Sequence, residues 1–197
     1  MSQLNLNFPE DVADLIKRCH ADAARNGWWT DLETGEPKQR NKGEMIALIH
    51  SEISEAFDAH KDNAYDDKLT HRDGAEVEMA DAVVRIADYM GGHGYNFDLD
   101  CADLKVGRDI GLHDMHWAAL HNALSKLMEK ERKNAEDTLE YRQTMSRNFS
   151  RLIGLICAFA QMAGMDLWGA VREKLDFNAH RADHKIENRR QEGGKAW

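Results

Sequence analysis

Proline is scarce in this chain, and so are residues that favour strands. Only two prolines, Pro9 and Pro37, occur among 197 residues, so helices can continue for many turns without the break that a proline imposes. Runs that alternate β-branched and polar residues, which are typical of half-buried strands, are nearly absent. These two absences argue against a sheet-based fold and predict an all-α chain.

Cysteine is also rare, and its spacing is uninformative for metal binding. The three cysteines, Cys19, Cys101 and Cys157, form no CxxC pair, and an odd count without zinc-ligand spacing argues against a disulfide framework. We therefore expect a cytoplasmic protein. The first residues have neither the basic nor the apolar region of a signal peptide. No apolar run approaches the length of a membrane span, so no membrane partner is expected.

The chain has an excess of acidic residues, with a formal net charge of −9. Such a surface repels phosphate groups, so non-specific binding to DNA or RNA is not expected. An anionic small substrate would need a metal ion or a local basic cluster. Hydrophobic residues make up 42% of the chain, enough for the core of a single domain over residues 1–197.

Hydrophobic periodicity predicts six helices. They cover about residues 9–25, 44–61, 72–90, 112–134, 140–164 and 167–178. The helices at about 44–61 and 72–90 form one pair and those at about 112–134 and 140–164 a second pair, which together predict a four-helix core. Residues 26–43 and about 95–111 are expected to be loops, and the tail at about 174–197 is polar and basic.

Two of the expected helices carry acids within or beside their apolar faces. In "MIALIHSEISEAF", Glu52 lies inside the apolar stripe and Glu55 at its edge, one turn later. In the following helix, Asp81 borders the stripe and Glu78 precedes it by one turn. Each helix therefore offers two carboxylates at i, i+3, which are neighbours on a helix surface.

Packed against each other, these helices would bring four carboxylates together. Unpaired, the acids would repel one another, and some would have to take up protons. Hard divalent cations prefer oxygen ligands, so we expect Mg²⁺, with Mn²⁺ as a substitute, to compensate the acids in place of a protein cation. A di-iron site needs ExxH on two helices, and the chain has none. The alternative is a solvated or Ca²⁺-binding acidic face in a non-catalytic helical interaction protein.

The segment "HSEISEAF", followed by "EVEMADAVVRIADY", resembles the MazG-like all-α nucleoside triphosphate pyrophosphohydrolases. The family pattern is ExxE, a short spacer and ExxD, and it is matched here by Glu52, Glu55, Glu78 and Asp81. The resemblance extends upstream to "NGWW" and downstream to "KLDFNAHR". Residues from about 100 to 150 carry little of it. Two further acids near the motif, Glu76 and Asp88, are either supporting or merely solvated.

The resemblance implies a reaction and a set of ligands. Enzymes of this kind cleave a nucleotide between its α- and β-phosphates and release a monophosphate and pyrophosphate. The four acids would hold Mg²⁺, which would neutralise the triphosphate and activate a water, and Glu55 is the candidate that orients this water as general base. Short chains of the family resemble dimers, so a homodimer is expected. The second helix pair would then either complete a bundle within one chain or thicken the dimer interface.

Basic residues near the C-terminus are candidates for binding the nucleotide. Lys174, Asn178 and Arg181 lie about one turn apart and share a face if the helix continues through them. Similar segments occur near the C-terminus of MazG-like enzymes, which implies contacts to phosphate or sugar, and Lys185 follows in the tail. Lys61 is a further phosphate candidate. The alternative for these residues is a solvated helix end.

Aromatic residues suggest where a base could bind. Trp28 and Trp29 lie in the first loop, where they can stack on a base or cap the core. His20 and Asn26 could line the same pocket. Three further histidines, His113, His116 and His121, lie close together in the sequence, and the spacing of His113 and His116 makes a second metal site conceivable. Because no acids or cysteines lie nearby, we expect these histidines to be partly buried or interfacial.

Overall fold

The computed structural model describes residues 12–102, 113–134 and 136–191, with the side chains of residues 113–116 left out. Within these ranges the chain is helical and contains no strand, which confirms the all-α prediction. The elements are α1 (Val12–Arg25), α2 (Lys42–Asp62), α3 (Gly74–Gly92), α4 (Leu99–Ala102), α5 (His113–Lys133), α6 (Leu139–Ala163), α7 (Leu167–His180), the 3₁₀ turn η1 (Ala182–His184) and α8 (Ile186–Arg189).

Polar side chains define the ends of the two helices that carry the acidic motif. The Asn41 side chain accepts a hydrogen bond from the Glu44 backbone at 3.0 Å and begins α2. Asp73 does the same for α3, accepting from the Ala75 backbone at 2.8 Å. Asn63 ends α2 with a left-handed backbone at φ 50°, a conformation that asparagine tolerates better than most residues.

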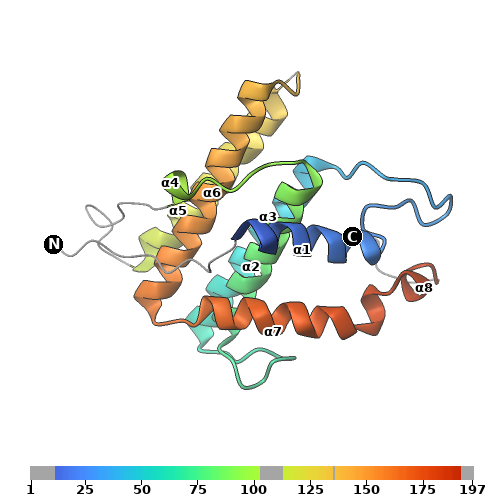
Figure 1. Ribbon diagram of the computed structural model, residues 1–197. Coiled ribbons are helices and arrows are strands. Elements are labelled where there is room, and N and C mark those ends of the chain that lie inside the picture. Colours follow the sequence, from blue (N-terminus) through green and yellow to red (C-terminus); the bar gives the residue numbers. More distant parts are fainter. Residues whose placement is uncertain (1–11, 103–112, 135, 192–197) are drawn as a thin grey trace.

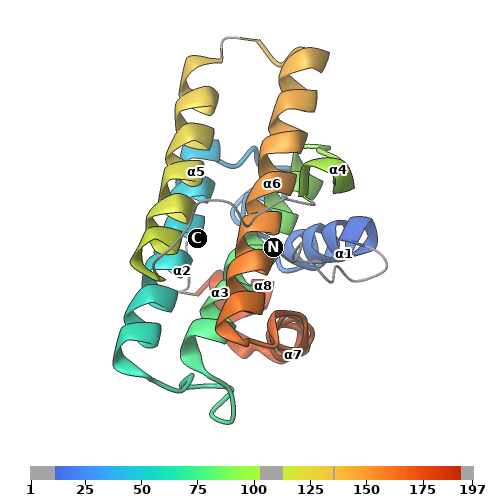
Figure 2. The same ribbon diagram turned by 90° about the vertical axis from the view of Figure 1, so that its left-hand side faces the viewer.

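Four helices form the core that the sequence predicts. Helix α2 contacts α3 and α5, and α6 contacts α3 and α5, so the ring closes within one chain. Figure 2 shows α5 and α6 side by side as a hairpin that extends beyond the other helices. Of the two outcomes expected for the second helix pair, the structure therefore shows a bundle completed within one chain.

Helix α3 is the centre of the molecule. Of its 19 residues, 13 are buried, and many are alanines that let neighbouring helices approach closely. Helices α1 and α7 pack on it outside the ring (Figure 1). Near its end, a side chain at Gly92 would meet the Trp29 ring at 2.1 Å, so only glycine lets the first loop rest there. The first loop, with Trp28 and Trp29, and α7, with Lys174 and Asn178, therefore both lie against α3, the helix that carries Glu78 and Asp81.

The C-terminal segment departs from the polar tail predicted at about 174–197. Helix α7 ends at His180, and Arg181 follows with an extended backbone, so the helix does not continue through Arg181. The chain then folds back on the first loop. There the buried Arg189 donates to the Asn26 carbonyl at 2.8 Å and lies 3.5 Å from the Trp28 ring centroid. A cation–π contact and a hydrogen bond anchor this segment.

Among the described residues, no single helix has the length and apolar composition that crossing a membrane requires. In the described part of the chain, the pair α6 and α7 meets these criteria when taken together, and the two helices are bent by 113° where they join.

Candidate metal centre and adjoining cavity

Antiparallel packing of α2 and α3 brings three of the four predicted metal ligands together. Glu52, Glu55 and Glu78 each offer a carboxylate oxygen, and these oxygens lie within 4.8 Å of one another. Glu52 is buried, Glu78 is half-buried and Glu55 is exposed. The group is thus anchored in the core at one end and open to solvent at the other.

The spacing of these oxygens fits a small divalent cation. Mg²⁺ binds oxygen at about 2.1 Å, so two oxygens on one ion lie at most about 4.2 Å apart. An adjustment below roughly 1 Å, within the reach of glutamate rotamers, would bring the three oxygens onto one ion. Three carboxylates also match the hard-ligand preference of Mg²⁺ and Mn²⁺. The exposed side near Glu55 leaves room for water or substrate oxygens.

Two of the predicted acids already have protein cations as partners. Arg85 donates from Nε to Glu52 Oε1 at 2.5 Å, and Lys174 Nζ lies 2.7 Å from Asp81 Oδ2. The expectation that no protein cation compensates the acids is therefore wrong for Glu52 and Asp81, while metal binding by these acids stays a prediction. The physical reason is burial, because a carboxylate in a poorly solvated setting needs a counter-charge close by.

These pairs do not neutralise the cluster. Four carboxylates face two cations, so the fully ionised group keeps a formal charge of about −2. Burial, followed by the charge of Asp81, raises the pKa of Glu78 above its usual range. Burial also raises the pKa of Asp81, an effect that Lys174 opposes. Because the raised pKa of Glu78 favours its protonated form, a divalent cation bound here would displace that proton as well as offset the charge of the ionised acids.

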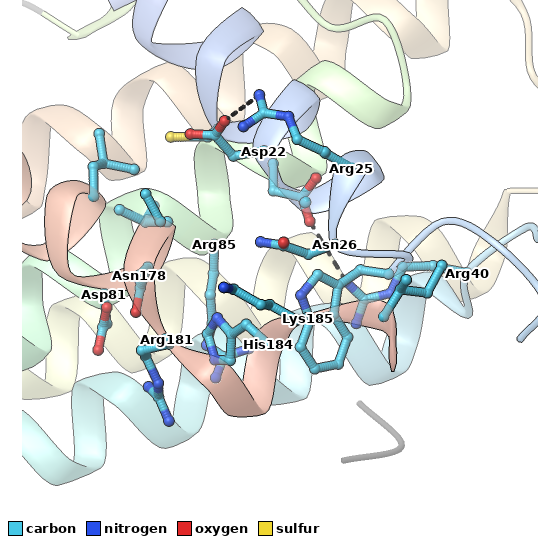
Figure 3. Close-up of a pocket in the computed structure, with 18 of the residues that line it drawn as sticks. Asp22, Arg25, Asn26, Arg40, Asp81, Arg85, Asn178, Arg181, His184 and Lys185 are labelled. Carbon is cyan, nitrogen blue, oxygen red and sulfur yellow. Dashed lines mark hydrogen bonds and ion pairs between the residues drawn. The ribbon is translucent and has the colours of Figure 1, made fainter. Parts of the chain in front are cut away.

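A cavity of about 430 Å³ adjoins the acidic cluster. It lies between α1, α3, α7 and the C-terminal segment (Figure 3). Asp81 and Arg85 line it, which places the acidic cluster at its margin. Its size suits a small organic ligand. Its lining carries five cationic side chains, Arg25, Arg40, Arg85, Arg181 and Lys185, and four acidic ones, Asp22, Asp81, Asp88 and Glu187.

Most of the predicted substrate-binding residues line this cavity. Asn178, Arg181, Lys185 and Trp28 do so, as does Asn26. The Asn178 Oδ1 atom is buried and has no hydrogen-bond partner among the described residues. A buried polar atom without a partner is costly, so this oxygen is suited to accept a hydrogen bond from a ligand.

Lys174 lies elsewhere than its predicted role requires. Its side chain is only 4% exposed and is directed to Asp81, so it supports the acidic cluster and not the cavity. Lys61 is exposed at the end of α2, where it lies 3.4 Å from Asp58. Neither contact resembles a phosphate-binding arrangement, and a role for Lys61 in binding substrate stays a prediction.

The two adjacent tryptophans have different environments. Trp29 donates from Nε1 to Asp88 at 2.8 Å and packs on the core, which fits the alternative in which it caps the core. Trp28 lines the cavity, but Arg189 covers one face of its ring. His20 lies 3.1 Å from Asp88 and belongs with Trp29. A base could therefore reach Trp28 but not Trp29.

Asp88 and Glu76, the extra acids near the motif, both hold neighbouring elements in place. The Asp88 carboxylate contacts Trp29 and His20 and also lies 3.5 Å from Arg40. Glu76 accepts from Arg72 and from the backbone of Asp166, which ties α3 to the start of α7. Both acids are supporting groups.

Sequence reasoning missed Arg85 and Arg40. Arg85 follows Asp81 by four residues on α3 and therefore lies on the same helix face, a signal that could have identified it. Arg40 lies in a loop, where no periodicity indicates which way a side chain points.

Among the described residues, His121 belongs to no cluster of potential metal ligands. His121 is partly buried, as predicted, and its Nδ1 lies 2.9 Å from His50 Nδ1. The side chains of His113 and His116 lie outside the described residues.

Comparison with known proteins adds no further support, since no family model, curated protein or solved structure matches the chain.

Proposed function

We propose that this chain is a Mg²⁺-dependent nucleoside triphosphate pyrophosphohydrolase of the MazG-like kind. It would cleave a ribo- or deoxyribonucleoside triphosphate into the monophosphate and pyrophosphate, with Mn²⁺ as a substitute metal. The observation that supports this proposal is the juxtaposition of three carboxylates, within 4.8 Å of one another, with a cavity whose lining includes Arg85, Arg181 and Lys185. The three carboxylates would bind the cation, and the arginine and lysine side chains in the adjoining cavity are suited to the phosphates.

Each group has a distinct task in this proposal. Bound Mg²⁺ would supply charge neutralisation of the phosphates and a more acidic water. Glu52 and Glu78 hold the ion, and the exposed Glu55 accepts the proton of the attacking water. Attack at the α-phosphorus breaks its bond to the oxygen that bridges to the β-phosphorus, and that oxygen leaves with pyrophosphate. Arg181 and Lys185, which line the cavity, bind the phosphates.

The assembly and compartment belong to the same proposal. A homodimer follows from the resemblance, and the closed helical ring within one chain means that such a dimer would not need to share its bundle. Light scattering coupled to size-exclusion chromatography would distinguish a dimer of 22.5 kDa chains from a monomer. All three cysteines are free thiols, which fits the reducing cytoplasm that we propose.

The proposed reaction can be tested directly. The protein is incubated with Mg²⁺ and a panel of ribo- and deoxyribonucleoside triphosphates in ¹⁸O-labelled water, and both products are measured. We expect pyrophosphate from at least one nucleotide and the ¹⁸O label in the monophosphate. Glu52→Gln and Glu78→Gln should lower kcat by roughly 100-fold or more.

The matched control is Asp58→Asn, since Asp58 is an exposed acid on α2 that pairs with Lys61. Its kcat should equal that of the wild type. Failure of every nucleotide to yield pyrophosphate, or full activity in Glu52→Gln, would exclude the proposed reaction.

A non-catalytic helical metal-binding or interaction protein is the second candidate. The ion pairs Arg85–Glu52 and Lys174–Asp81 favour it, because acids that serve only structure need such partners. The same nucleotide panel separates the two candidates, since this one releases no pyrophosphate under any condition.

A further inference from the structure

Three acids, Glu52, Glu55 and Glu78, form the acidic trio. Among the described residues, Arg85 alone both pairs with a member of this trio and lines the cavity. Its Nε contacts Glu52 Oε1 at 2.5 Å, while 39% of its side chain stays exposed against 7% for Glu52. Figure 3 shows Arg85 among the side chains that line the cavity, with Asp81, Arg181 and Lys185. One guanidinium therefore reaches from the acidic cluster to the place proposed for the phosphates.

The chemistry of this contact opposes metal binding. A guanidinium keeps its charge at any physiological pH, so Arg85 cannot relieve its repulsion of a cation by losing a proton. Its hydrogen bond also occupies Oε1, one of the two oxygens that Glu52 can offer to a metal. Arg85 and a divalent ion therefore compete for Glu52.

The same guanidinium is suited to a second partner. Arginine presents several N–H donors in a planar fork that matches phosphate oxygens, and its long side chain is flexible. The exposed part of Arg85 faces a cavity whose other cationic groups include Arg181 and Lys185. A phosphate bound there would offer Arg85 the negative charge that it loses when a metal takes Glu52.

We propose that Arg85 is a displaceable counter-ion of the metal site. Without metal it neutralises Glu52, and when a divalent ion binds Glu52, the guanidinium transfers to a phosphate oxygen of the nucleotide. This inference rests on the proposed function. It adds a coupling, because the nucleotide removes the competitor of the metal, and each ligand then strengthens binding of the other by the same factor.

Binding measurements without turnover test this role. Mn²⁺ is titrated by electron paramagnetic resonance, alone and with each of the four α,β-imido deoxynucleoside triphosphates, which cannot be cleaved between the α- and β-phosphates. In the wild type we expect the tightest-binding analogue to strengthen Mn²⁺ binding at least tenfold. Arg85→Met should bind Mn²⁺ alone about tenfold more tightly, and its coupling to the analogue should be about tenfold weaker than in the wild type, since only the direct attraction between metal and phosphates remains.

Two further variants make the test specific. Arg85→Lys keeps the charge without the planar fork, and it should restore Mn²⁺ affinity toward the wild-type value while recovering only part of the coupling. Arg132→Met removes an exposed arginine on α5 that pairs with Glu129, and it should change neither quantity. Circular dichroism verifies that each variant is folded.

The outcomes separate this inference from the proposed function. Unchanged or weaker Mn²⁺ binding in Arg85→Met, or coupling in that variant as strong as in the wild type, would overturn the role of Arg85 and leave the metal site standing. Absence of Mn²⁺ binding in the wild type would overturn both. If Arg85→Met does not fold, a coupling in Arg85→Lys equal to that of the wild type would overturn the role of the guanidinium.

Discussion

Lys174 illustrates how burial decides the role of a charged side chain. Its spacing on the last long helix suggests a phosphate ligand, yet its ammonium group lies 2.7 Å from Asp81 and is almost fully enclosed. In so poorly solvated a setting, the pair is held together because separating either member leaves a charge without a partner. The role of Lys174 is therefore to stabilise the acidic cluster through Asp81, and not to contact a ligand.

Lys174→Met should consequently destabilise the protein. Loss of one partner from a largely buried pair leaves Asp81 uncompensated and should lower the free energy of unfolding by about 3 kcal/mol. Urea denaturation at pH 7 without divalent metal measures this difference. The double variant Lys174→Met with Asp81→Asn should recover most of the loss, since no isolated charge remains. A change below about 1 kcal/mol in the single variant would contradict this account.

His93 should make stability depend on pH. Burial, and then the charge of Lys42, lowers its pKa from 6.5 to about 4. The folded protein thus binds fewer protons than the unfolded chain between these values, so the stability contributed by neutral His93 is complete above pH 6.5 and is lost as the pH falls toward 4. From pH 7 to pH 5 this loss amounts to about 2 kcal/mol.

The variant His93→Phe should remove the part of the pH dependence of stability that is due to His93. The difference between the unfolding free energies at pH 7 and pH 5, measured by urea denaturation, should shrink by about 2 kcal/mol. His180→Phe, at an exposed position on α7, is the control and should leave the difference unchanged. Equal pH dependence in His93→Phe and the wild type would refute the assignment.

Among the helices, α7 depends on side-chain contacts to hold its place. It packs on α3, and Arg72, just before α3, donates to Glu173 on α7 at 2.7 Å and also to Glu76. Helix α7 carries both Lys174 and Asn178, so the contacts of Arg72 set the position of α7 relative to the acidic cluster and the cavity.

Arg72→Met should loosen α7 while leaving the core ring intact. Hydrogen bonds to charged groups contribute about 1.5–3 kcal/mol, so amide exchange in α7 should accelerate by at least roughly tenfold, while α2 and α5 change little. Hydrogen exchange followed by mass spectrometry resolves these helices. Arg151→Met, at an exposed position on α6, provides the comparison. Uniform acceleration across all helices would instead indicate a global loss of stability.

At the scale of the whole molecule, the sequence predicts the helices better than the contacts between them. The helix expected at about 44–61 is observed at Lys42–Asp62 and that at about 140–164 at Leu139–Ala163, because periodicity and caps are local properties. The meeting of Glu52, Glu55 and Glu78 follows from the same patterns, since two amphipathic helices joined by a short loop pack as neighbours.

Contacts between distant segments could not be predicted in this way. The pair Arg72–Glu173 joins residues 101 positions apart, and Arg189 meets Asn26 across 163 positions. Such pairings depend on the angle and register at which helices pack, and many registers are compatible with one pattern of apolar residues. Docking of the C-terminal segment, and with it the shape of the cavity, therefore required the structure.

Metal binding should stabilise the whole molecule. Helices α2 and α3 both belong to the core ring, so an ion held by Glu52, Glu55 and Glu78 is bound only while the ring is intact. Mg²⁺ at 100 times its dissociation constant should raise the free energy of unfolding by about 2.7 kcal/mol. Thermal and urea denaturation with and without Mg²⁺, at matched ionic strength, measure this change.

A chain with a net charge of −9 also gains stability from any cation that screens its self-repulsion, and this effect has to be distinguished from a specific site. Glu78→Gln and Asp58→Asn each replace one carboxyl group with an amide, but only Glu78 belongs to the group of Glu52, Glu55 and Glu78. The stabilisation by Mg²⁺ should therefore be lost in Glu78→Gln and retained in Asp58→Asn. If both variants respond to Mg²⁺ as the wild type does, the ion acts by diffuse screening, and the three carboxylates do not form its site.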